Sequence, residues 1–205
     1  MEFSGTFELE DTTVDEVWLA LSDSVLVRSA LPGCEFLIPV ADEDPDFDTL
    51  REEATERDEE PTADPETIMD RAFEEGGQYA AVMAISVGPV NPTFETIVTI
   101  ENRNHPSMRA SGEGSAGNSS FEMSSGMELI ETDDGVAVEW DAEADIFGRI
   151  ASMGQRVVNP VANKVVERFF SSIQDELREQ TIASEGDLDE LSGTDDESDT
   201  SKNNT

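Results

Sequence analysis

The chain has few of the side chains that carry covalent and metal chemistry. Cys34 is its one cysteine and His105 its one histidine among 205 residues. A lone cysteine excludes an intramolecular disulfide and a cysteine-cluster metal site. The longest nearly apolar stretch, residues 79–87, is far shorter than the roughly 20 residues of a membrane-spanning helix. Glu2 and Glu8 stand where a signal peptide carries positive charge, so we expect a cytoplasmic protein.

Positive charge is also scarce. Lys and Arg number 12 against 48 Asp and Glu, which gives a net charge of −36. Residues 42–75 hold 16 of the acids and residues 183–205 hold 8, yet the rest of the chain still has 24 acids and 8 bases. Because phosphate contacts need a basic surface, this composition argues against nucleic-acid binding.

Acidity spread along the whole chain is typical of a cytoplasmic protein from a halophilic archaeon. At about 1 M salt the screening length falls to roughly 3 Å, which removes most of the self-repulsion. The alternative is an acidic surface that meets one basic partner. That alternative predicts acids clustered on one element instead of distributed over every strand.

The segment from residue 144 to residue 170 has the most informative pattern. An alternating strand ends at Gly148, and apolar residues then recur at steps of three and four, as on one face of a helix. Such a helix needs a broad apolar surface, which the preceding strands provide. We therefore predict an α+β fold, a curled antiparallel sheet around a long C-terminal helix. The apolar positions are Val157, Val158, Val161, Val165, Val166, Phe169, Phe170 and Ile173.

We expect a single domain over residues 1–182. Residues 42–75 have the composition of a solvated or disordered acidic insertion, with one helical turn beginning at Asp64 and Pro65. An exposed loop is favoured there over a functional lid. Residues 183–205 are expected to form a disordered acidic tail. The expected strands are residues 2–9, 34–40, 79–87, 94–102, 107–116, 119–131 and 136–147, with two short helices between the first two.

The residues present do not assemble into a catalytic or metal site. Residues 112–117 match the glycine fingerprint of dinucleotide binding, but polar, strand-like segments flank them where that fingerprint needs a buried strand and a helix. Carboxylates in residues 139–145 alternate with apolar residues, which places them on a solvent-facing side. Cys34 has no histidine placed near it, and His105 precedes a proline in an expected turn. Both are predicted to be structural.

Several methionines lie on the apolar phase of their expected elements. Methionine fills irregular gaps in a core and also adapts to variable apolar ligands. Core filling and a ligand cavity are therefore both open on this pattern. The candidate cavity residues are Met83, Ile85, Phe121, Met123, Met127, Met153 and Val157.

The charge reverses locally near the start of the last helix. Residues 146–166 contain Arg149, Arg156 and Lys164 and no acid. A spacing of seven puts the two arginines on nearly the same side of a helix, and Pro160 predicts a kink. We expect these cations to dock on an anionic membrane surface or a partner enzyme. The alternative is that they neutralise nearby strand carboxylates.

Three motifs resemble the G-subunit family of carbon monoxide dehydrogenase, a branch of the SRPBCC (START-like, helix-grip) superfamily. They are Leu31-Pro32-Gly33-Cys34-Glu35, Ser86-Val87-Gly88-Pro89 and the segment of residues 148–170. The resemblance covers most of residues 1–41 and 78–178, and the insertion of residues 42–75 departs from the family pattern.

The resemblance implies a helix-grip fold that usually encloses an apolar cavity, which favours a ligand site over a filled core. It implies a non-enzymatic protein that binds a quinone or another lipid, with no tightly bound cofactor. The protein would serve a molybdenum hydroxylase of the carbon monoxide dehydrogenase type, peripherally at the inner face of the membrane. The alternatives are a polyketide-cyclase-like enzyme of the same superfamily and a structural assembly factor with a filled core.

Overall fold

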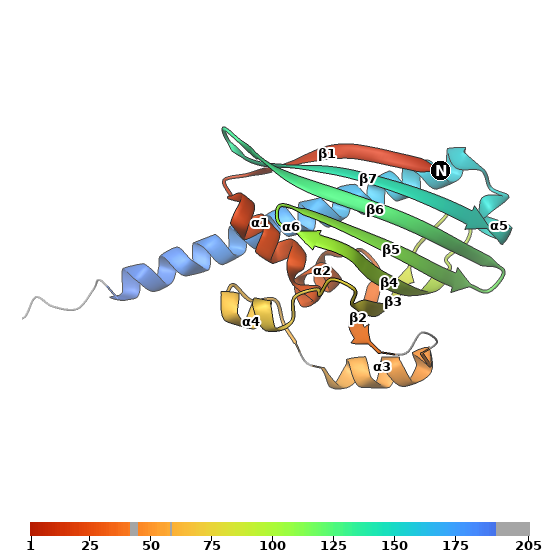
Figure 1. The fold of residues 1–205 in the computed structure, drawn as a ribbon, viewed down its shortest axis with the longest axis horizontal. Helices are drawn as coiled ribbons and strands as arrows, with labels where there is room; N and C mark the ends of the chain where they lie inside the picture. Colours follow the sequence, from red (N-terminus) through yellow and green to blue (C-terminus); the bar gives the residue numbers. More distant parts are fainter. Residues whose placement is uncertain (42–44, 58, 192–205) are drawn as a thin grey trace, which may run out of the picture.

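The computed structural model describes residues 1–41, 45–57 and 59–191, with side chains described up to residue 179. These residues form a seven-stranded antiparallel sheet in the order β1-β7-β6-β5-β4-β3-β2. Together with a long C-terminal helix, it confirms the predicted fold class (Figure 1). The strands are β1 (Glu2–Glu10), β2 (Cys34–Val40), β3 (Gln78–Ala84), β4 (Thr93–Asn104), β5 (Ser107–Ala116), β6 (Ser119–Thr132) and β7 (Gly135–Phe147). The helices are α1 (Val14–Ser22), α2 (Ser24–Ala30), α3 (Phe47–Glu56), α4 (Pro65–Asp70), α5 (Gly148–Ala151) and α6 (Gln155–Leu191).

The main core lies between α6 and one face of the sheet. Figure 1 shows α6 running behind the strands, from the α5 end of the sheet toward α1. Phe170 and Ile173 of α6 are buried, and the Phe170 ring stacks on Phe7 of β1 with centroids 5.4 Å apart. Alternation along β6 buries Leu129 on this inner face and leaves Ile130 39% exposed on the outer face.

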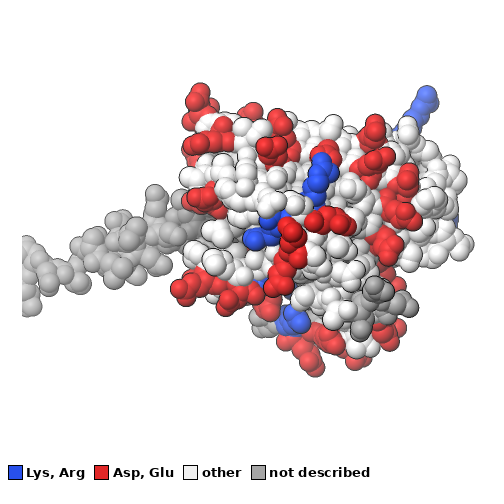
Figure 2. Space-filling view, in the orientation of Figure 1, with Lys and Arg blue, Asp and Glu red and all other residues white. Residues whose placement is uncertain are grey.

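The outer face of the sheet carries much of the acidic charge. Along β7, Glu139, Asp141, Glu143 and Asp145 are all exposed, as alternation predicts. Figure 2 shows Asp and Glu side chains spread over this face, with few Lys or Arg among them. The acids are thus distributed over several strands instead of gathered on one element.

α5 and α6 are separate helices. Gly148 begins α5 and Gly154 lies between the two helices, both with φ of +76°, a conformation that favours glycine. A Cβ at Gly148 would lie 1.8 Å from the carbonyl oxygen of Asn118. Arg149 is therefore on α5 and Arg156 on α6. The prediction that their spacing places them on one side of a continuous helix is wrong, because the left-handed backbone at Gly154 interrupts it.

α6 extends farther than the sequence predicts. It contains Pro160 and continues to Leu191, so residues 183–191, expected in a disordered tail, have helical backbone. The segment after Pro160 contains no further proline, so a helix that has formed can propagate through it. Residues 192–205, the rest of the expected tail, lie outside the described residues. Within the described part of the chain, no helix is both long and apolar enough to cross a bilayer.

The acidic insertion packs on the outer face of the sheet through α3. Leu50 of α3 is buried there, and Phe47 and Ala54 extend the same face at three- and four-residue steps. The expectation of a solvated or disordered segment is therefore wrong for α3, because this short apolar face covers apolar strand residues. Its partners on β2 and β3 are Phe36, Ile38, Ala80 and Val82.

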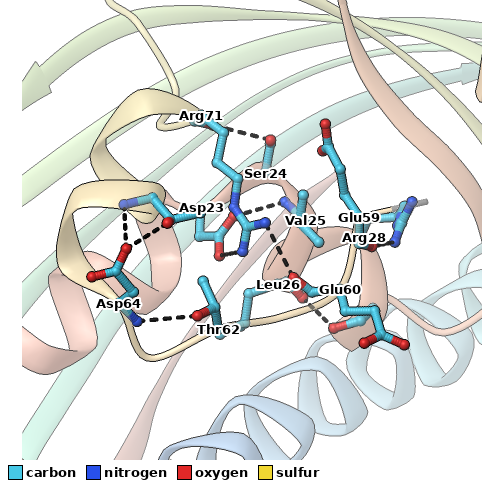
Figure 3. Close-up of polar contacts among 12 residues, drawn as sticks. Asp23, Ser24, Val25, Leu26, Arg28, Glu59, Glu60, Thr62, Asp64 and Arg71 are labelled. Carbon is cyan, nitrogen blue, oxygen red and sulfur yellow. Dashed lines mark hydrogen bonds and ion pairs between the residues drawn. The ribbon is translucent and has the colours of Figure 1, made fainter. Parts of the chain in front are cut away.

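A buried ion pair attaches the end of the insertion to the junction of α1 and α2 (Figure 3). Asp23 caps the N-terminus of α2, since its Oδ1 accepts a hydrogen bond from the Val25 amide at 2.9 Å. Its Oδ2 lies 2.7 Å from Nη2 of Arg71, which follows α4. Two residues later, the Phe73 amide donates to the Ser22 carbonyl at 2.9 Å. This part of the insertion is therefore held by specific polar contacts.

Candidate ligand site

A cavity of about 260 Å³, open on one side, lies between α6 and strands β5, β6 and β7. Val166, Phe169 and Phe170 line it from α6. Even-numbered residues of β5 and β7 and odd-numbered residues of β6 face the helix, because side chains alternate along each strand. The strand side chains around the cavity are Met108, Ala110, Met123, Ser125, Met127, Trp140 and Ala142.

Strand register explains why this space exists. Ala110 of β5 pairs with Ser125 of β6, and Ser125 pairs with Ala142 of β7, so three small side chains form one row across the sheet. Close packing would normally fill the space above such a row. Large side chains beside the row, together with α6 above it, instead leave a trough. The adjacent row, paired in the same way, consists of Met108, Met127 and Trp140.

Ser125 supplies a hydroxyl to the cavity. This hydroxyl forms no hydrogen bond with the described residues, so it can donate to or accept from a ligand. Asp141 also borders the cavity, but by alternation its carboxylate lies on the outer face, 3.1 Å from Nη2 of Arg109. The arrangement suits an uncharged, largely apolar ligand that carries an oxygen atom.

Six of the seven predicted cavity residues fall into two groups in the structure. Met123 and Met127 line the cavity. The seventh residue, Met83, lies on the inner face of β3 with Tyr79 by alternation, and it belongs neither to the cavity nor to the cluster near α5 described next. Core filling, the alternative interpretation of the methionine pattern, describes the second group, which packs around buried side chains near α5. Its members are Ile85, Phe121, Met153 and Val157, and the buried side chains are Val87, Phe94, Ile150 and Val158.

Sequence reasoning did not identify Ser125, Trp140 or Phe169 as cavity residues. Trp140 and Phe169 stand at apolar positions of the periodic patterns of β7 and α6, but such a position does not distinguish a cavity wall from a filled core. The row that contains Ser125 becomes visible only when the β5–β6 and β6–β7 registers are known. The tight turn at residues 133–135, which joins β6 to β7, is the sequence signal from which one of these registers could be derived.

The predicted docking cations Arg149, Arg156 and Lys164 form no side-chain ion pair or hydrogen bond with the part of the chain that is described. This observation does not support the alternative in which they neutralise strand carboxylates. Two residues before Arg149, Phe147 is 50% exposed. The arginines that do pair with carboxylates are Arg51, Arg71, Arg109 and Arg178.

Cys34 and His105 do not line the cavity. Burial raises the pKa of the Cys34 thiol to about 11, which keeps it protonated and weakly nucleophilic near neutral pH. His105 Nε2 lies 3.2 Å from an Asp15 carboxylate oxygen, and its ring meets Trp18 edge-on at 5.2 Å. Neither residue has the geometry of a nucleophile with a base beside it.

Comparison with solved structures shows the same fold in other proteins. A conserved protein from Geobacillus kaustophilus is similar, with a TM-score of 0.66 and 21% identity over 87% of this chain and 96% of that chain. The Zhui aromatase/cyclase from Streptomyces has a TM-score of 0.53 and 10% identity over 88% of this chain and 94% of that chain. Ara h 8.0201 has a TM-score of 0.53 and 11% identity over 87% and 98%. These low identities show a shared helix-grip fold of the SRPBCC type and nothing finer.

No curated protein matches the chain. The family model described as the G subunit of carbon monoxide dehydrogenase (CoxG) matches residues 70–178, which is more than half of the 205 residues. The matched region includes β5, β6, β7 and the part of α6 that covers the cavity. The chain therefore belongs to the CoxG family, that of the carbon monoxide dehydrogenase G subunit.

Proposed function

We propose that the protein binds an uncharged hydrophobic molecule beneath α6 and serves a molybdenum hydroxylase of the carbon monoxide dehydrogenase type without catalysing a reaction itself. The observation that carries this proposal is the cavity, where a row of small side chains lies between large apolar ones and, among the described residues that border it, no titratable side chain points into it. Family membership supports the choice of partner enzyme.

The size of the cavity bears on the ligand. At about 260 Å³ it is slightly smaller than the ~300–1,000 Å³ typical of small-molecule pockets, so it suits one ring better than a whole lipid. A quinone matches this chemistry, because its flat ring packs against the side chains of Met127 and Trp140. The Ser125 hydroxyl then donates a hydrogen bond to one quinone carbonyl, and the isoprenoid tail extends out of the cavity.

Tryptophan fluorescence tests the proposal, because Trp140 lines the cavity. A short-tailed quinone analogue should quench the emission saturably. Ala142→Leu should abolish quenching by filling the trough, and Ser125→Ala should weaken binding by about 1 kcal/mol, or roughly fivefold. Ser124→Ala, on the exposed outer face of the same strand, is the matched control. A folded Ala142→Leu variant that binds the analogue like the parent would refute the ligand site.

We also propose that Arg149 and Arg156 dock the protein peripherally on an anionic membrane surface, together with the exposed Phe147, which precedes Arg149 by two residues. Their lack of carboxylate partners among the described residues supports this role. Reversal of both arginines to Glu should abolish co-sedimentation with phosphatidylglycerol vesicles. The same reversal at Arg51 and Arg109, which are already ion-paired, changes the net charge equally and should have little effect. Equal binding by both double variants would contradict the proposal.

Two alternatives make different predictions. A polyketide-cyclase-like enzyme shares this fold but needs an acid or base that faces its substrate, whereas Ser125 offers only a hydroxyl. A structural assembly factor needs no ligand at all. Native mass spectrometry of the purified protein separates these functions, because a retained quinone mass supports the ligand carrier. A ligand-free protein that also fails to bind the analogue supports the assembly factor.

A further inference from the structure

A second hollow, of about 390 Å³, lies on the other side of α6 from the cavity. Its helix wall includes Val161, Lys164, Val165 and Arg168, and the opposite wall is formed by the turn before β2 and the end of β3. The cavity beneath α6 uses Val166, Phe169 and Phe170 instead. The two spaces therefore face different sides of one helix, and the second requires its own explanation.

The charge of this hollow is opposite to that of the protein. The described residues that line it include Lys164 and Arg168 and no Asp or Glu, although acids outnumber bases four to one in the chain. Neither cation forms an ion pair or a side-chain hydrogen bond with the described residues. Both cations are exposed and stand four residues apart on the helix, so they occupy neighbouring positions and an anion bound between them would be attracted to both.

Apolar side chains make up part of the lining around the two cations, and one wall is held in place by a backbone hydrogen bond. Ile85, Pro160, Val161 and Val165 supply apolar surface. The turn before β2 is tied to β3, since the Ala84 amide donates to the Gly33 carbonyl at 2.8 Å. Opposite the helix, the Ser86 hydroxyl has no hydrogen-bond partner among the described residues. The hollow thus combines two cations and a hydroxyl with a hydrocarbon-compatible wall.

We propose that this hollow binds the anionic head group of an amphiphile, a carboxylate or phosphate attached to a hydrocarbon chain. Lys164 and Arg168 hold the anionic oxygens by charge-assisted hydrogen bonds, and Ser86 donates a third. The first methylene groups of the chain lie against Val161, Val165 and Ile85. This site is independent of the uncharged-ligand cavity and of the proposed docking by Arg149 and Arg156.

Calorimetric titration of the full chain with decanoate and with decanol tests the site. Decanoate should bind saturably, at least about tenfold more tightly than decanol, and more weakly at high salt. Lys164→Gln with Arg168→Gln should remove this preference, whereas Lys164→Arg with Arg168→Lys should retain it. Arg149→Gln with Arg156→Gln, which carries the same change in charge outside the hollow, is the matched control.

Thermal melts of each variant establish that it is folded. Equal affinity for decanoate and decanol, or a folded Gln double variant that keeps the preference, would overturn the proposal. Phosphatidylglycerol vesicles identify the source of the head group. If they displace decanoate from the parent protein, the site accepts a lipid phosphate, and if they do not, it is specific for a free carboxylate. Quinone quenching of Trp140 should be unchanged in the Gln double variant, so failure here and failure of the proposed function are distinguishable.

Discussion

Neutralisation of Asp23 tests how firmly the acidic insertion is attached to the domain. The Asp23 side chain is 0% exposed and lies 2.7 Å from Arg71, whose side chain is 15% exposed. Asp23→Asn keeps the side-chain volume and an oxygen that can accept from the Val25 amide. It removes the charge that compensates the Arg71 guanidinium. Figure 3 shows that the segment from Glu59 to Arg71 runs past this pair, and Arg71 also donates a hydrogen bond to the Glu60 carbonyl, so the insertion should loosen with it.

The expected loss of stability can be estimated from this environment. Removal of one partner of a buried ion pair costs about 3–5 kcal/mol. Arg71 retains a hydrogen bond from Nη1 to the Glu60 carbonyl at 3.1 Å, so we expect about 3 kcal/mol for Asp23→Asn. Asp23→Ala also removes the cap of α2, which adds about 1 kcal/mol. Either loss is a large fraction of the ~5–15 kcal/mol that stabilises a typical domain.

Urea denaturation of a double-mutant cycle measures this coupling. Arg71→Met should cost about as much as Asp23→Asn, because it leaves the buried carboxylate unpaired. The double variant should recover much of the loss, since it leaves no uncompensated charge. Arg178→Met breaks the exposed pair with Glu10 and should cost less than about 1 kcal/mol.

Hydrogen exchange locates the effect. In Asp23→Asn, the amides of residues 64–73 should exchange faster, while those of β6 and β7 change less. A stability loss below about 1 kcal/mol, equal to that of the exposed Arg178 pair, would refute the idea that the buried pair anchors the insertion.

Three further predictions concern charge, the thiol and the helix break. If the protein is halophilic, as its net charge of −36 suggests, its melting temperature should rise steeply from low salt to molar KCl, and a constant value would exclude that interpretation. The folded pKa of Cys34 is raised to about 11 from an ordinary value of 9.0, so its stabilising contribution is complete below pH 9 and is lost as the pH rises through 11. Cys34→Ala should therefore reduce the fall in unfolding free energy over that range. Tyr79, whose pKa is also raised, contributes to the pH dependence of both proteins, so its contribution cancels when the variant is compared with the parent. Gly148→Ala should destabilise the protein more than Gly154→Ala in urea titrations. Both glycines have φ of +76°, so each substitution costs about 1–2 kcal/mol for the left-handed conformation alone. Only the new Cβ at Gly148 also meets backbone atoms.

The helix-grip architecture could be predicted because its signals are local. Alternation along β6 and β7 and the three- and four-residue steps that bury Phe170 and Ile173 each report which side of one element faces the core. β3 also contains a signal for a covered outer face. Its residues Ala80 and Val82 are as apolar as their neighbours Tyr79 and Ala81, and a strand that is apolar on both faces is covered on both faces. That pattern predicts that another element covers the outer face, and in the structure this element is α3.

Tertiary structure alone decided the candidate sites and the attachment of the insertion. The trough exists because Ala110, Ser125 and Ala142 meet in one row, which depends on the pairing of three strands. Asp23 is one of 48 acidic residues, and it can be buried only because Arg71, 48 positions away, compensates its charge. The sequence by itself determined which residues are apolar and at what period they recur. Which apolar side chains leave a cavity between them, and which charged side chains lack an ion-pair partner, depends on contacts between residues far apart in the chain.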